Sequence, residues 1–82
     1  MKEGESIMVD VVFEGMLIEV CVTLETGCFF YDDLVIVQVL NGETMSQYRS
    51  DKNVCSDDEL LDVVHGDWGF RHLAREEAGS VI

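Results

Sequence analysis

Residues 7–24 read IMVDVVFEGMLIEVCVTL, and this stretch decides the fold. Apolar residues alternate on both sides of Glu14-Gly15, which is the pattern of half-buried strands. We predict that Glu14-Gly15 is a two-residue hairpin turn. A one-residue slip would exchange the two faces, so the apolar matches favour this register. The predicted pairs are Phe13–Met16, Val11–Ile18, Val9–Val20 and Ile7–Val22 on one face, and Val12–Leu17, Asp10–Glu19 and Met8–Cys21 on the other.

The same reasoning extends the sheet through two further glycine turns. Thr26-Gly27 predicts a second hairpin, which places Asp32 opposite Cys21 and diagonal to Glu19. Continued pairing would turn Asp33 towards the apolar face, so we expect a bulge at Asp32-Asp33. The strand resumes over residues 34–40, and Asn41-Gly42 then predicts a hairpin leading into a fourth strand from Glu43 to Tyr48 or Arg49.

The hydrophobic period changes to that of a helix after Lys52. Ser56 and Glu59 fit a capping box, and apolar residues with helical spacing follow until Gly66. Asp67 can cap a second helix over residues 68–78, with Gly79 as its stop. One helix kinked at residues 66–69 is the alternative. The sequence therefore predicts an α+β fold, with a four-stranded antiparallel meander followed by one or two helices packed on one face.

Composition indicates a single folded domain spanning residues 1–82, with residues 1–5 and 79–82 as loose ends. The chain is 48% hydrophobic and has seven aromatic residues, unlike disordered acidic segments. Three cysteines without close spacing argue against a disulfide framework. Neither a signal peptide nor a membrane span is recognisable, so we expect a cytoplasmic protein.

Charge is distributed very unevenly along the chain. The formal net charge is −12, and no Lys, Arg or His occurs between Glu3 and Tyr48, a stretch with nine carboxylates. Without a basic patch to neutralise phosphates, direct binding to nucleic acid is disfavoured. The expected partner is instead a cationic protein, and in particular a protein that binds nucleic acid.

Catalytic and cofactor sites find little support in the residues. The cysteines and histidines lack the close pairs of a zinc site. Cys55 or Ser56 could pair with a histidine as a nucleophile, but Ser56 is better explained as a helix cap. Asp10, Glu19 and Asp32 could together bind Mg²⁺ or Ca²⁺, which leaves a divalent-metal-dependent enzyme as a weaker hypothesis. We therefore expect no enzyme activity, no cofactor and no metal.

The leading hypothesis is an acidic interaction protein that mimics DNA. It would inhibit or regulate a nucleic-acid-binding protein by presenting carboxylates in place of phosphates, as phage or mobile-element anti-defence proteins do. The predicted partner-binding residues are Asp10, Glu14, Glu19, Glu25, Asp32 and Asp33.

A competing hypothesis concerns the strand over residues 34–40, which is apolar on both faces. Such a strand should be covered twice. One cover would come from the C-terminal helices, and the other from a second copy of the chain through Leu34, Ile36 and Leu40. This predicts a homodimer, or a structural or adaptor subunit that docks onto a larger assembly.

Overall fold

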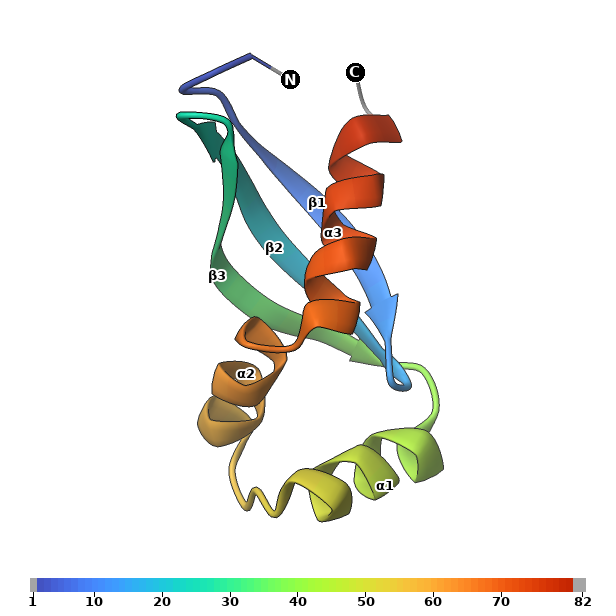
Figure 1. Cartoon of the computed structure of the whole chain (residues 1–82). Coiled ribbons are helices and arrows are strands. Elements are labelled where there is room, and N and C mark those ends of the chain that lie inside the picture. The colour runs from blue at the N-terminus through green and yellow to red at the C-terminus, as the bar shows by residue number, and fades with distance from the viewer. Residues whose placement is uncertain (1, 81–82) are drawn as a thin grey trace.

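A computed structural model describes residues 2–80 as one antiparallel sheet followed by three helices (Figure 1). The strand order in the sheet is β1-β2-β3, so each strand pairs with its neighbour in sequence. The elements are β1 (Ser6–Phe13), β2 (Met16–Glu25), β3 (Cys28–Val39), α1 (Gly42–Lys52), α2 (Asp57–His65) and α3 (Trp68–Ser80).

The predicted register of the first two hairpins is confirmed. Phe13 pairs with Met16 and Asp10 with Glu19, and every other predicted pair of β1 and β2 is also present. Across the second turn, Cys21 pairs with Asp32 as expected. Both turns have positive φ at their two central residues, 47° and 77° at Glu14-Gly15 and 49° and 78° at Thr26-Gly27. These values identify the tight hairpin turns whose twist matches that of the strands.

The predicted bulge in β3 is also confirmed. The register shifts between Glu19 and Cys21, which pair with Val35 and Asp32, and Asp33 takes the left-handed conformation with φ 55°. A second shift follows near Val37, since Leu17 pairs with Gln38 and Ile18 with Ile36. β3 therefore bends twice as it crosses the sheet.

The predicted fourth strand is wrong, because residues 42–52 form helix α1. Asn41 has an extended backbone, and its side chain accepts hydrogen bonds from the backbone N–H groups of Glu43 and Thr44. It is therefore a helix N-cap and not the first residue of a hairpin turn. Met45 and Tyr48 are buried three residues apart, the spacing of one helix face.

Two further helices follow, so the fold has three helices where we predicted one or two. Ser56 caps α2 by accepting from Glu59 N–H, as expected, and Glu59 accepts in return from Cys55 N–H. Gly66 ends α2, and the Asp67 side chain accepts from Gly69 N–H at the start of α3. The alternative of one kinked helix is excluded, and α3 continues through Gly79.

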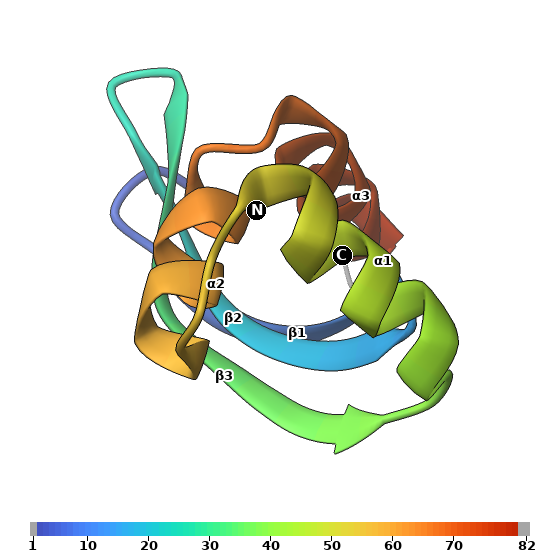
Figure 2. The ribbon, with the colours of Figure 1, turned by 90° about the horizontal axis from the view of Figure 1, so that it is seen from below.

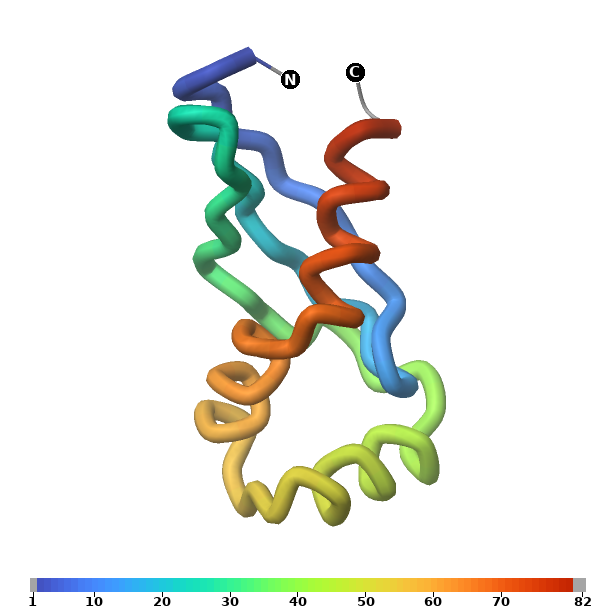
Figure 3. The backbone as a smooth tube through the Cα atoms, in the orientation of Figure 1, coloured from blue at the N-terminus to red at the C-terminus, as the bar shows by residue number. Residues whose placement is uncertain are grey.

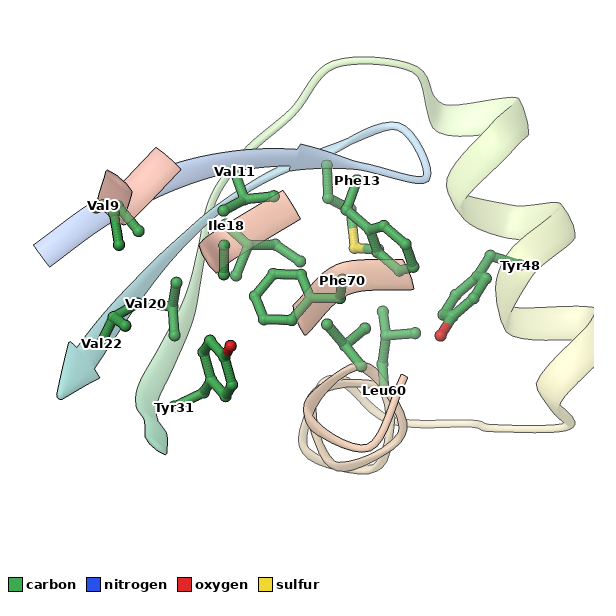
Figure 4. Close-up of a cluster of buried hydrophobic side chains, with 14 of the residues drawn as sticks. Val9, Val11, Phe13, Ile18, Val20, Val22, Tyr31, Tyr48, Leu60 and Phe70 are labelled. Carbon is green, nitrogen blue, oxygen red and sulfur yellow. The ribbon is translucent and has the colours of Figure 1, made fainter. Parts of the chain in front are cut away.

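All three helices lie on one side of the sheet (Figure 2). Phe70 of α3 lies at the centre of the core, and its ring meets that of Phe13 edge to face at 5.7 Å (Figure 4). The buried residues alternate along the strands and recur at helical spacing in the helices. They are Val9, Val11, Phe13, Met16, Ile18, Val20, Val22, Tyr31, Met45, Tyr48, Leu60, Val64, Phe70, Ala74 and Ala78.

The opposite side of the sheet, which we call the outer face, has no helix over it in the part of the chain that the structure describes. By the register, side chains from all three strands belong to it. They include Met8, Asp10, Val12, Leu17, Glu19, Cys21, Phe30, Asp32 and Val35.

The tube in Figure 3 shows the start of β1 beside the turn between β2 and β3. Gly4 N–H donates to the Leu24 carbonyl, and Leu24 N–H donates to the Glu5 carbonyl. Within the expected loose ends, Gly4 and Glu5 are thus bonded to β2, and Gly79 and Ser80 belong to α3. Residues 1, 81 and 82 lie outside the described residues.

Candidate functional site

Three of the predicted partner-binding carboxylates lie together on the outer face. Asp10 and Glu19 are directly opposite each other on β1 and β2. Asp32 on β3 pairs with Cys21, two residues along β2 from Glu19. Since neighbouring strands are about 4.8 Å apart, these side chains form one group across the sheet. We call Asp10, Glu19 and Asp32 the carboxylate row.

The other three predicted residues do not lie in the row. Glu14 and Glu25 stand at the β1–β2 and β2–β3 turns, at opposite ends of the sheet, and both are exposed. Asp33 is the left-handed residue of the bulge. It lines a groove between β3 and α2, beside Asp32. The predicted set is therefore spread over the sheet and its two ends.

The groove between β3 and α2 is lined in part by acids that are not among the predicted partner-binding residues. It has a volume of about 360 Å³ and is lined by Asp32, Asp33, Leu34, Asp58, Leu61, Asp62 and His65. Asp58 and Asp62 are one helical turn apart, so they lie on the same side of α2. That spacing was visible in the sequence, but the contact of α2 with the bulge was not. Acidic side chains thus continue from the outer face around β3.

His65 connects α2 to β3 at this groove. Its Nε2 atom is 2.6 Å from the Tyr31 carbonyl oxygen, and the Arg71 side chain donates a hydrogen bond to the His65 carbonyl oxygen at 2.8 Å. Burial raises the pKa of the Tyr31 hydroxyl, and the positive charges of Arg75 and Arg71 partly oppose that rise. These two hydrogen bonds therefore join α2 to β3 and to α3 beside the groove.

The basic side chains contact aromatic rings more often than carboxylates. Arg71 lies 5.7 Å from the Tyr31 ring and Arg75 lies 5.0 Å from the Phe29 ring. Lys52 lies 5.7 Å from the Tyr48 ring. In such cation–π contacts the aromatic ring attracts the positive charge, so these side chains are stabilised without a carboxylate partner.

Few carboxylates are neutralised within residues 2–80. Arg49 and Asp57 form one ion pair at 3.4 Å, and His72 contacts Glu76 at 3.1 Å, which is an ion pair only when the histidine is protonated. No basic residue occurs anywhere in the strands. The carboxylate row therefore has no cationic neighbour in the sheet.

The three residues predicted to form a dimer interface do not share one exposed surface. Leu34 and Ile36 are half-buried and pack against the core, and Ile36 lies opposite the buried Ile18. Leu40 is exposed at the end of β3. The exposed apolar residues in this part of β3, residues 34–39, are instead Val35, Val37 and Val39.

Across the described range, no three His, Cys, Asp or Glu side chains are arranged so that they could hold a metal ion. None of the helices that the structure describes is long and apolar enough to cross a bilayer.

Comparison with known proteins gave no relative. No protein-family model, no curated protein sequence and no solved structure matches this chain significantly.

Proposed function

We propose that this protein is a non-enzymatic inhibitor or regulator of a nucleic-acid-binding protein, which it binds through the carboxylate row. One observation carries the proposal. Within the described residues 2–80, the row lies on a sheet face that no helix covers, and the strands contain no basic residue. A cationic protein would supply the counter-charges that the sheet lacks.

Strand geometry supports the mimicry of phosphates. Alternate residues on one face of a strand are about 6.6 Å apart, and neighbouring strands are about 4.8 Å apart. Phosphates on one DNA strand follow at about 3.4 Å along the helix axis, so two nucleotides span a similar distance. A cationic groove that binds a phosphate backbone could therefore contact several of these carboxylates at once.

The groove acids extend the same surface. Asp33, Asp58 and Asp62 continue the negative charge from Asp32 around the edge of β3. Direct nucleic-acid binding by this surface is disfavoured, because carboxylates repel phosphates. Small acidic inhibitors of this kind suit a phage or mobile element, and their targets would place the protein in the cytoplasm of the host cell.

A capture experiment tests this proposal. The protein is immobilised, exposed to a bacterial lysate and eluted either with duplex DNA at constant ionic strength or with NaCl. We expect nucleic-acid-binding proteins to be released by the DNA. The triple variant Asp10→Asn, Glu19→Gln, Asp32→Asn should lose them.

A matched variant controls for net charge. Glu3→Gln, Asp51→Asn, Glu77→Gln removes the same number of carboxylates from exposed positions outside the row. It should capture the same proteins as the unmodified chain. Equal loss in both variants would show that only total charge matters, and release by NaCl but not by DNA would contradict mimicry.

A further inference from the structure

The outer face also has an apolar patch, formed by Val12, Leu17, Val35 and Val37. Val12 lies opposite Leu17, and Leu17 pairs with Gln38, the residue that follows Val37 at the second bulge of β3. Val12, Val35 and Val37 are 61%, 51% and 54% exposed, although side chains of this type are usually inside. Val39 and Leu40 extend the exposed apolar surface around the end of β3.

The apolar patch and the carboxylate row share a border. Glu19 is directly opposite Val35 on β3 and two residues from Leu17 on β2. Asp10 is two residues from Val12 on β1, and it faces Glu19. A partner that covers the patch must therefore also cover, or lie against, this pair of carboxylates.

A second copy of the chain suits this surface poorly. Stacking two outer faces would bring two Asp10–Glu19 pairs into one interface with no basic residue from either sheet. Each copy also carries a formal charge of −12, so the approach itself is repulsive. Charge complementarity instead selects a partner that is both apolar and basic.

We infer that the outer face binds an amphipathic basic helix, whose apolar side chains cover the patch while adjacent Lys or Arg side chains pair with Asp10 and Glu19. Residues three and four apart on a helix are about 5–6 Å from each other. This spacing is close to the distances between side chains on one face of a sheet. The inference rests on the proposed function, because it specifies the partner surface that the same face recognises.

Three synthetic peptides of 18 residues test this inference. The first has a stripe of Leu at helical spacing on a Lys-rich helix, the second replaces each Leu by Ala, and the third replaces each Lys by Glu. Binding is measured by fluorescence anisotropy in 150 mM NaCl. We expect the Leu/Lys peptide to bind at least tenfold tighter than the Ala/Lys peptide, and the Leu/Glu peptide not to bind.

Variants of the protein locate the binding surface. Val12→Ser with Val35→Ser should reduce the affinity for the Leu/Lys peptide to that for the Ala/Lys peptide, and should leave the latter unchanged. Met8→Ser with Phe30→Ser is the matched control, since both residues are exposed on the same face outside the patch. Circular dichroism and thermal unfolding confirm that each variant is folded.

The outcomes distinguish this inference from the proposed function. Equal binding of the Leu/Lys and Ala/Lys peptides would overturn the amphipathic partner, whereas the DNA-competed capture could still succeed. Equal loss in both variant pairs would also overturn it. Sedimentation that shows a dimer dissociated by the Val12 and Val35 changes would assign the patch to a second copy instead.

Discussion

The Tyr48 hydroxyl group donates a hydrogen bond to the Asp67 carboxylate, with 3.0 Å between the two oxygen atoms. The other oxygen of the same carboxylate accepts from Gly69 N–H, where α3 begins. Asp67 therefore joins the buried face of α1 to the start of α3. The Tyr48 ring also contacts the Phe13 ring edge to face at 5.4 Å, which links α1 to the sheet.

Replacement of Tyr48 by Phe should destabilise the protein by about 1.5 kcal/mol. The change removes a hydrogen bond to a charged acceptor, a class worth roughly that amount, and keeps the buried ring. Urea unfolding at pH 7 measures the loss. Ser80→Ala, which removes an exposed hydroxyl bonded to the Glu76 carbonyl, is the control and should change stability much less. Equal stability of Tyr48→Phe and the unmodified protein would contradict this role.

Stability should fall as the solution becomes alkaline. Burial, together with the hydrogen bond and negative charge of Asp67, raises the pKa of Tyr48 above its ordinary value of 10.0. Above about pH 10 the unfolded chain loses this proton while the folded chain keeps it, so unfolding becomes more favourable. Urea midpoints from pH 8 to 11 should decline above about pH 9.5.

The same titration with Tyr48→Phe identifies the residue responsible. The decline should be smaller in this variant, and the part that remains includes Tyr31, whose pKa is also raised by burial. An identical slope in the two proteins would rule out Tyr48 as the main alkaline group.

Gly15 and Gly27 should respond differently to the same substitution. Both have nearly the same φ, 77° and 78°, so an added side chain costs about 1–2 kcal/mol at either turn. A Cβ atom at Gly27 meets nothing within 4 Å, whereas one at Gly15 overlaps the Asn41 carbonyl oxygen. Gly15→Ala should therefore lose about 1–3 kcal/mol more than Gly27→Ala in urea unfolding. Equal losses would show that the β1–β2 turn does not pack against the start of α1.

Glu19→Lys should stabilise the isolated protein and weaken binding to its partner. It converts the repulsive pair with Asp10 into an attractive one, a gain of up to about 1 kcal/mol. Glu25→Lys makes the same charge change at the exposed end of β2 and serves as the control for stability. Thermal unfolding compares the two variants. A melting temperature for Glu19→Lys no higher than that for Glu25→Lys would count against a destabilising repulsion between Asp10 and Glu19.

Salt should stabilise the protein without selectivity among cations. Screening reduces self-repulsion, and the Debye length is about 10 Å at 0.1 M. Because no three His, Cys, Asp or Glu side chains within residues 2–80 are arranged so that they could hold a metal ion, NaCl and MgCl₂ at equal ionic strength should raise the melting temperature alike. A much larger effect of MgCl₂ would reveal a specific ion site and revive the metal-dependent hypothesis.

Local patterns predicted the hairpins well, because alternation and turn residues act over a few positions. Asn41 shows where such reasoning fails, since Asn-Gly favours a tight hairpin turn and Asn also favours the helix N-cap. The decision rests on Met45 and Tyr48, which are buried together only when residues 42–52 are helical. The three-residue spacing of Met45 and Tyr48 is visible in the sequence and fits one helix face. The polar residues on either side of Met45 also fit the alternation of a strand, so the spacing alone did not indicate a helix.

Only part of the candidate site was predicted from the sequence. The Asp10, Glu19 and Asp32 row follows from strand register, which the sequence determines. The groove acids Asp58 and Asp62 join it only because α2 packs beside the bulge. That packing depends on contacts between residues far apart in the chain, so no local pattern could reveal it.

The sheet contains carboxylates and no cation, whereas the helical layer mixes its carboxylates with Arg49, Lys52, Arg71 and Arg75, so both layers are net negative but only the sheet is free of positive charge. A cationic surface would attract the molecule most strongly through the layer in which no positive charge opposes the carboxylates. Collisions would therefore begin with the outer face forward more often than by chance, and more of them would be productive. For the partner that we propose, the arrangement of charge would thus influence how quickly the complex forms, as well as how tightly it is held.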